Sequence, residues 1–420
     1  MALFNAVAVL IALAALFSWL NYRFIRLPAT IAMLLFSLMT SIGLVALGKL
    51  GMDSDALAQG ILGEVQLDQA LLGGMLSFLL FAGALRVNLR EIEQRKWAVG
   101  FLASLGVVVS TALVGLAAFG IFAALGQHIP LIWCLLFGAL ISPTDPISVL
   151  AILKSAQAEK SLEAKMAGEA LLNDGFAVVL FVLLLGIAIT GEGTSAAHVG
   201  ALFAREVLGG TLFGFALGYA GYRMLASVEH YQVEILATLA VVMGGYAAAI
   251  ALHISGPIAI VVAGMLIGNY GPREAMSAMT RERVETFWEL IDEILNAVLF
   301  VMIGLELLRL ELDASYLWAA ALAVPAVLIA RLLSVGLAGL VPGLRADFPP
   351  YVIGILTWGG LRGGISVALA LALPASPWRD PIIAVTYVVV VFSIVVQGLT
   401  LARVLRRAAS GAASGARTRA

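Results

Sequence analysis

The stretch ISPTDPISVL, residues 141–150, interrupts a strongly apolar segment with two prolines, a threonine and an aspartate. Proline removes a backbone hydrogen bond from a helix and clashes with the preceding turn, so Pro143 and Pro146 predict a break. In a bilayer, the backbone groups freed at Thr144 and Asp145 must find partners inside the protein. The stretch therefore predicts a discontinuous helix with oxygen atoms at its centre. An ordinary proline kink capped by the threonine is the simpler interpretation, and this stretch alone does not separate the two.

The composition of the whole chain places it in a membrane. Of its 420 residues, 62% are hydrophobic and 12% charged, and the mean hydropathy is +1.03. A soluble fold of this size would need a more polar surface. With about 20 apolar residues to a span, the sequence predicts an all-α polytopic membrane protein with about 13 transmembrane helices. The net charge of −1 gives no indication of a nucleic-acid partner.

The basic residues indicate how the chain is oriented in the cell membrane. With the N-terminus outside and the C-terminus in the cytoplasm, 19 of the 25 Lys and Arg residues fall on the cytoplasmic side. This is the positive bias expected of cytoplasmic loops. We expect a transmembrane domain over residues 1–408. Residues 409–420 are small, polar and basic, and we expect them to form a disordered cytoplasmic tail.

A second interrupted span accompanies the first. The break at residues 141–150 lies in span five, and span twelve, residues 350–373, contains four glycines around Arg362. If span seven is a linker, spans 1–6 and 8–13 form two inverted six-helix repeats in which helices 5 and 12 are the discontinuous ones. Broken helices at matching positions of inverted repeats are typical of secondary transporters that bind substrate near the bilayer midplane.

Five ionisable side chains lie deep within predicted spans, where each is costly and usually functional. They are Asp145, Glu169, Asp174, Arg331 and Arg362. Their formal charges sum to −1, so one monovalent cation or one proton would neutralise the group. Glu169 and the two guanidiniums are able to pair among themselves, which leaves Asp174 as the candidate acid for binding the ion or the proton.

This charge count predicts an exchanger. A desolvated carboxylate takes up a proton unless a cation holds it ionised, so proton and metal ion compete for one site. The hydroxyl of Thr144 and the carbonyls freed at the break are hard ligands, suited to an alkali cation. Asp145 would offset the positive end of one half-helix and Arg362 the negative end of another. We predict electroneutral one-for-one exchange of Na⁺, or of Li⁺ or K⁺, for H⁺.

Four motifs in combination resemble those of a known family. They are PTDP at 143–146, GEALLND at 168–174, RLLSV at 331–335 and GGLRGG at 359–364. Together they are similar to the monovalent cation:proton antiporter-1 family, which includes bacterial sodium/proton antiporters of the NhaP type and animal sodium/proton exchangers. We expect a core of helices over about 98–189 and 316–405 that moves against the remaining helices. The resemblance implies that those remaining helices form a homodimer contact.

The resemblance also implies a role for individual residues. Asp174 would bind the ion or the proton, Thr144 would be a ligand, and Asn173 would have a structural, hydrogen-bonding role. An asparagine before the aspartate is similar to the electroneutral branch of the family. Some members have a serine at the position of Ala170 and an acid in span three, where this chain has Ala82. These departures leave the full ligand set, and the choice among Na⁺, Li⁺ and K⁺, open.

The remaining deep charges receive structural roles from the same resemblance. Asp145 and Arg362 would lie at the crossing of two unwound helices, and Glu169 and Arg331 would form an ion bridge. Three further acids begin the tenth predicted span, and they either line its cytoplasmic end or attract cations to a funnel. They are Glu289, Asp292 and Glu293.

Other classes of function fit the sequence less well. An enzyme is not expected, because the chain has no HExxH motif, no phosphate-binding loop and no aspartate pair of the membrane-protease type. No cofactor is expected either. A cation channel and a cotransporter of an organic anion are the alternatives that share this type of helical architecture. A cotransporter of an organic anion would need more polar and aromatic side chains at the breaks to bind its substrate than Thr144 and Asp145 provide.

Overall fold

The computed structural model describes residues 2–49, 67–87, 93, 96–156, 160–190, 196–270, 277–306 and 313–417. Over these ranges the chain is helical and contains no strand. Seven of the described helices have the length and apolar composition needed to cross a membrane, and three shorter apolar helices accompany them. The chain is therefore an all-α, multi-pass membrane protein.

The first half of the chain supplies the helices that precede and contain the first break. They are α1 (Ala2–Leu20), α2 (Ala29–Lys49), α4 (Leu67–Leu85), α6 (Lys96–Phe101), α7 (Val107–Ala124), α8 (Leu131–Ile141), α9 (Pro146–Ser155) and α10 (Lys160–Thr190). A π-helical turn, Leu102–Gly106, joins α6 to α7.

The second half supplies the helices around the second break. They are α11 (Ala196–Leu225), α12 (Tyr231–Ala251), α13 (Gly256–Tyr270), α14 (Ala278–Glu306), α15 (Ala314–Leu340), α16 (Pro350–Trp358), α17 (Gly364–Leu371), α18 (Arg379–Phe392) and α19 (Gly398–Arg417). Another π-helical turn, Ser393–Gln397, joins α18 to α19.

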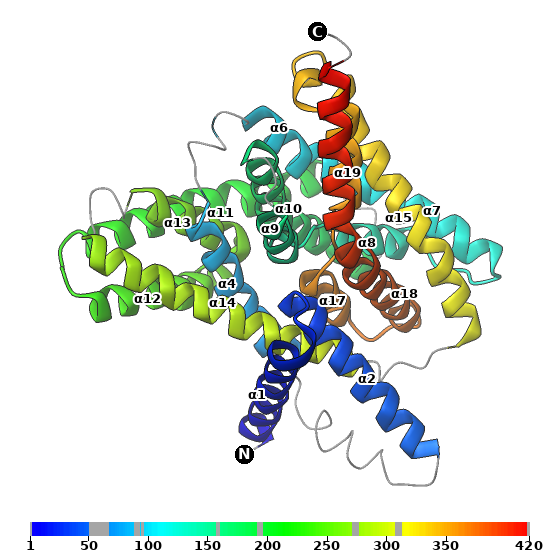
Figure 1. Ribbon diagram of the computed structural model, residues 1–420, viewed down its shortest axis with the longest axis horizontal. Helices are drawn as coiled ribbons and strands as arrows, with labels where there is room; N and C mark the ends of the chain where they lie inside the picture. Colours follow the sequence, from blue (N-terminus) through cyan, green and yellow to red (C-terminus); the bar gives the residue numbers. More distant parts are fainter. Residues whose placement is uncertain are drawn as a thin grey trace.

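Three of the helices that flank the two breaks lie in the middle of the molecule, together with the long helix α10. In Figure 1, α8, α9, α10 and α17 occupy the centre, with α12, α13 and α14 on one side and α7 and α15 on the other. On the first side α13 packs against α11 and α4, and α14 packs against α2 and α4. On the other side α7 packs against α8 and α15.

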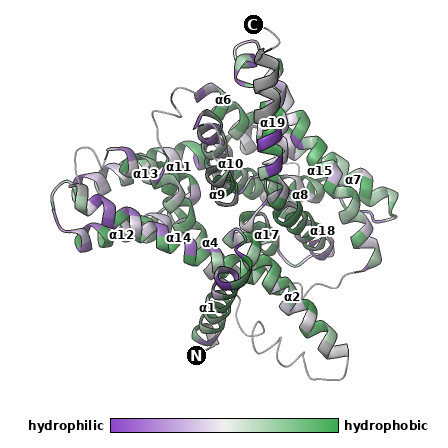
Figure 2. Cartoon of the chain, viewed as in Figure 1, coloured by the Kyte–Doolittle hydropathy of each residue, from purple (hydrophilic) through white to green (hydrophobic). Residues whose placement is uncertain are grey.

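The outer faces of the helices are apolar. Figure 2 shows hydrophobic residues along most of the helices, with hydrophilic residues gathered at places such as the outer end of α12 and α19. Large apolar side chains are exposed on the outer helices, including Leu212, Leu236 and Trp318. Apolar exposure on this scale is expected where lipid covers the surface.

Both predicted helix breaks are present, and they meet. The chain leaves the helical conformation at residues 142–145, between α8 and α9, and again at 359–363, between α16 and α17. The backbone N–H of Asp145 donates a hydrogen bond to the carbonyl of Leu361 (2.7 Å). A side chain at Gly363 would place its Cβ 2.7 Å from the Cβ of Asp145, so only glycine permits this approach.

The last described helix, α19, extends to Arg417 and so enters the segment 409–420. The disorder that we expect for that segment stays a prediction. The segment is rich in alanine, which has the highest helix propensity, and it extends a helix that is already anchored by packing. The small polar composition that suggested disorder is thus compatible with a helical extension.

Candidate functional site

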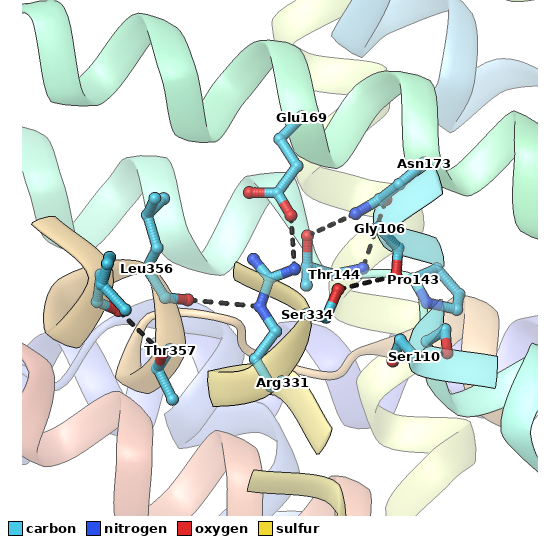
Figure 3. Close-up of polar contacts among 12 residues, drawn as sticks. Gly106, Ser110, Pro143, Thr144, Glu169, Asn173, Arg331, Ser334, Leu356 and Thr357 are labelled. Atoms are coloured by element: carbon cyan, nitrogen blue, oxygen red, sulfur yellow. Dashed lines mark hydrogen bonds and ion pairs between the residues drawn. The ribbon is translucent and has the colours of Figure 1, made fainter. Parts of the chain in front are cut away.

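The first helix break is held by an asparagine from α10. The side-chain amide of Asn173 donates a hydrogen bond from Nδ2 to Oγ1 of Thr144 (2.9 Å). In return, the backbone N–H of Thr144 donates to Oδ1 of Asn173 (3.3 Å). Figure 3 shows both contacts, which are buried. Asn173 therefore satisfies a backbone group that the break releases, which is the need that a broken helix creates inside a membrane.

The carboxylate of Asp174 follows directly on α10. Its side chain is 2% exposed, and Oδ1 has no hydrogen-bond partner among the residues that the structure describes. Desolvating an ionised carboxylate is costly unless a cation or a proton compensates it. An ionised Asp174 would therefore need a bound cation or a proton to compensate its charge.

Asp145 caps the second half of the broken helix. It lies directly before α9, and the backbone N–H and Oγ of Ser148 donate to its two carboxylate oxygens (3.4 and 2.6 Å). A carboxylate at a helix N-terminus is stabilised by the unpaired N–H groups and by the helix dipole. Asp145 therefore caps the N-terminus of α9, where the break ends.

Arg362 supplies the opposite charge at the crossing. Its side chain is 2% exposed, and Nη1 donates to the carbonyls of Ser142 and Pro143, the latter at 3.0 Å. Its backbone N–H donates to Oγ of Ser393 (2.8 Å). The guanidinium thus lies at the C-terminal end of α8, where free carbonyls carry partial negative charge. Nη2 has no hydrogen-bond partner in the described part of the chain.

Glu169 and Arg331 form an ion pair that joins α10 to α15. Oε1 of Glu169 lies 2.5 Å from Nη1 of Arg331, and both side chains are buried. Nε of Arg331 donates to the carbonyl of Leu356 on α16 (3.4 Å). A Cβ at Gly360 would lie 2.8 Å from that nitrogen, so the glycine makes room for the guanidinium. Figure 3 shows the pair beside Thr144 and Asn173.

The two departures noted in the sequence are apolar positions in the structure. Ala170 lies on α10 between Glu169 and Asn173, and Ala82 lies on α4; both are buried. Neither offers an oxygen atom beyond its backbone. Among the residues predicted to bind the ion, side-chain oxygens are therefore present on Asp174, Thr144 and Asn173.

Several buried serines form hydrogen bonds around the site that the sequence did not predict. Oγ of Ser142 donates to Oγ of Ser110 on α7 (2.9 Å), and Ser334 on α15 donates to the carbonyl of Gly106 in the π-helical turn (2.8 Å). The link between Ser148 and Asp145 has a local signal, since the two are three residues apart at a helix start. Ser110 and Ser334 have no such signal, because their partners come from distant helices.

The donor set fits an alkali cation rather than a transition metal. Across the described residues there is no cluster of three or more His, Cys, Asp or Glu side chains that could hold a metal ion. One carboxylate with hydroxyl and carbonyl oxygens is a hard, weakly charged set, which suits a monovalent ion that must also be released.

Comparison with known proteins agrees with this architecture. The family model described as "Sodium/hydrogen exchanger, transmembrane" matches residues 9–407. The Na(+)/H(+) antiporter NhaP of Pseudomonas aeruginosa is 48% identical over 412 residues, which is 97% of each chain. The Na(+)/H(+) antiporter NhaH of Halobacillus dabanensis is 33% identical over 399 residues, or 89% of this chain and 96% of the relative.

A solved structure has the same fold. The sodium proton antiporter MjNhaP1 of Methanocaldococcus jannaschii superposes with a TM-score of 0.75, over 96% of this chain and 99% of that one, at 17% sequence identity. The family model covers nearly the whole chain, and a relative is almost half identical over its length. The chain therefore belongs to the sodium/hydrogen exchanger family.

Proposed function

We propose that this chain is a secondary antiporter that exchanges one Na⁺ for one H⁺ across the cell membrane. The observation that carries the proposal is the buried carboxylate of Asp174, whose Oδ1 lacks a hydrogen-bond partner among the described residues. The Na(+)/H(+) antiporters among its relatives support the choice of ions.

The exchange follows from competition at one carboxylate. Asp174 binds either a proton or a dehydrated Na⁺, and the hydroxyl of Thr144 provides a further oxygen ligand for the metal ion. Asn173 holds the break open by pairing with Thr144, so it positions that hydroxyl rather than carrying charge. Because an empty, ionised Asp174 would have to cross the low-dielectric interior uncompensated, the carrier reorients only when it is loaded.

The charges around the site support a one-for-one ratio. Glu169 and Arg331 neutralise each other, and Asp145 and Arg362 lie at opposite half-helix ends. Asp174 is then the single charge that an ion or a proton must balance, and both loaded forms are neutral. The cycle therefore moves no net charge.

The remaining features of the proposal concern the whole assembly. About 13 membrane-spanning helices form two inverted repeats, with the N-terminus outside and the C-terminus in the cytoplasm. A core of residues about 98–189 and 316–405 rocks against the other helices, which form a homodimer contact. The positive bias of the cytoplasmic segments and the two crossed breaks support this arrangement.

Transport by the purified protein in liposomes tests the proposal. A fluorescent pH reporter inside the vesicles should record proton movement when Na⁺ is added, with Li⁺ and K⁺ titrated separately. Asp174→Asn should abolish this signal. Asp380→Asn is the matched control, because its side chain is 80% exposed at the start of α18, and it should transport like the parent.

Each alternative predicts a different result from the same vesicles. A cation channel would give Na⁺ flux that does not saturate and is not coupled to protons. A cotransporter of an organic anion would need that anion before any Na⁺ or H⁺ moves. Robust Na⁺-driven proton flux in Asp174→Asn would refute the assignment of the site.

A further inference from the structure

A second buried acid lies outside the site described above, on α14. The side chain of Asp292 is paired with Arg86, which follows the last residue of α4. Nδ2 of Asn296, one turn further along α14, donates to Oδ1 of Asp292 (2.9 Å). The sequence placed Asp292 among three acids that either line the cytoplasmic end of the span or attract cations to a funnel. Its neighbours Glu289 and Glu293 are exposed, whereas Asp292 is 4% exposed.

Asp292 occupies the face of α14 that is turned toward the helix crossing. Leu299 is seven residues further on, hence on the same face, and its side chain packs directly against Gly364 at the start of α17. Both α14 and α4 contact α17. The acid therefore lies on the face of α14 that meets the crossing, although α14 is outside the proposed core.

The two members of the ion pair differ in their access to solvent. The side chain of Arg86 is 41% exposed and that of Asp292 is 6% exposed. The backbone beside Arg86 is fixed, because Asn269 on α13 donates to the carbonyl of Val87 (2.8 Å). A long cationic side chain on a fixed backbone, with 41% of its surface exposed, is able to exchange with a free cation. The buried pair Glu169–Arg331 lacks that exposure.

We propose that Asp292 is an access site for the transported cation and that Arg86 is a tethered cation that competes for it. An incoming Na⁺ displaces the guanidinium, is held by the Asp292 carboxylate with the amide of Asn296 beside it, and passes on toward Asp174. When no ion is present, Arg86 returns and compensates the buried carboxylate. This inference rests on the proposed antiport and adds a residue that controls how readily the ion arrives.

The two partners make opposite predictions, which a merely structural ion pair does not. Removing the acid removes the attraction for Na⁺, so Asp292→Asn should raise the KM for Na⁺ by about tenfold, as loss of one nearby charge does at intermediate dielectric. Removing the competitor should lower it, so Arg86→Gln should reduce the KM for Na⁺ roughly threefold or more. In both variants kcat should change by less than about twofold, because neither group binds the ion during reorientation.

The experiment is Na⁺-driven proton flux in proteoliposomes at pH 8, with KM and kcat for Na⁺ fitted separately for the parent and each variant. Arg281→Gln and Glu285→Gln are matched controls, since this pair lies on the same helix with both side chains about half exposed. Both controls should keep the parent KM. Stabilisation of the detergent-solubilised variants by Na⁺ gives a second readout that does not depend on transport.

The outcomes separate the access site from the proposed function. If the parent protein shows no Na⁺-driven proton flux, the antiport proposal fails. If the parent exchanges ions but both variants shift KM in the same direction, or neither shifts it, the access site is wrong and the pair is structural. Should Asp292→Asn fail to fold, Arg86→Gln decides alone, because only a tethered competitor predicts a lower KM.

Discussion

Breaking the ion pair between Glu169 and Arg331 should destabilise the protein strongly and in a coupled way. Both side chains are buried, and their charged atoms are 2.5 Å apart. Removing one partner of a buried pair leaves an uncompensated charge and typically costs about 3–5 kcal/mol. Glu169→Gln leaves the guanidinium of Arg331 with the carbonyl of Leu356 as its remaining partner. Arg331→Gln leaves the carboxylate of Glu169 buried without its cationic partner.

The expected size of the effect follows from the length of the chain. At about 2.1 cal/mol/K of unfolding entropy per residue, 420 residues give ~0.9 kcal/mol/K, so a loss of 3–5 kcal/mol lowers Tm by about 3–6 °C. The double variant Glu169→Gln/Arg331→Gln leaves no unpaired charge and should lose less than the sum of the two single losses. Thermal unfolding of the purified protein in detergent measures all three.

The surface pair Arg281–Glu285 provides the control for this prediction. Its side chains are about half exposed, and an exposed pair contributes about 0–1 kcal/mol. Its single variants should therefore shift Tm by about 1 °C or less. If the losses from Glu169→Gln and Arg331→Gln simply add in the double variant, the two side chains do not interact in the folded protein and the reasoning fails.

Three further changes test other parts of the structure. A potassium and valinomycin potential, imposed with Na⁺ and H⁺ equal on both sides, should drive no pH change, although it does work of about 2.3 kcal/mol per elementary charge at 100 mV; a pH change would mean an electrogenic cycle. Gly363→Ala should lower the free energy of unfolding by about 1–3 kcal/mol and slow transport, because the added Cβ would lie 2.7 Å from the Cβ of Asp145. Gly354→Ala is the control: its added Cβ meets open space, so neither the unfolding nor the flux should change. Thr144→Val should raise the KM for Na⁺ and lower Tm by stranding the amide of Asn173, while Thr144→Ser should restore both.

The two helix breaks were predictable because their causes are local. Pro143 and Pro146 cannot continue a helix, and the glycines around Arg362 weaken one. The sequence also indicated that oxygen atoms gather at the first break. That the two breaks cross was implied only by the family resemblance. The hydrogen bond that joins Asp145 to Leu361 had no signal in the sequence pattern, since no periodicity encodes a contact between segments more than two hundred residues apart.

The partners of the buried charges were harder to predict than the charges themselves. Hydropathy identifies a carboxylate or guanidinium inside a span wherever it occurs. The serine that accepts the backbone N–H of Arg362 is Ser393, the first residue of the π-helical turn after α18, where it is one small polar residue in an apolar run. The ion pair of Asp292 with Arg86 depends on how α4 meets α14, which packing decides and sequence spacing does not.

The tie between the two breaks has a consequence for ion selectivity. The backbone N–H of Asp145 donates a hydrogen bond to the carbonyl of Leu361, and Arg362 donates hydrogen bonds to the carbonyls of Ser142 and Pro143. These hydrogen bonds join the two unwound segments to each other. In the proposed cycle, the oxygen atoms around Asp174 would then keep the same spacing whichever side of the membrane the site faces. Discrimination among Na⁺, Li⁺ and K⁺ would be an equilibrium property of a single binding site. The order of preference among these ions should be identical when it is measured from the inner and the outer side.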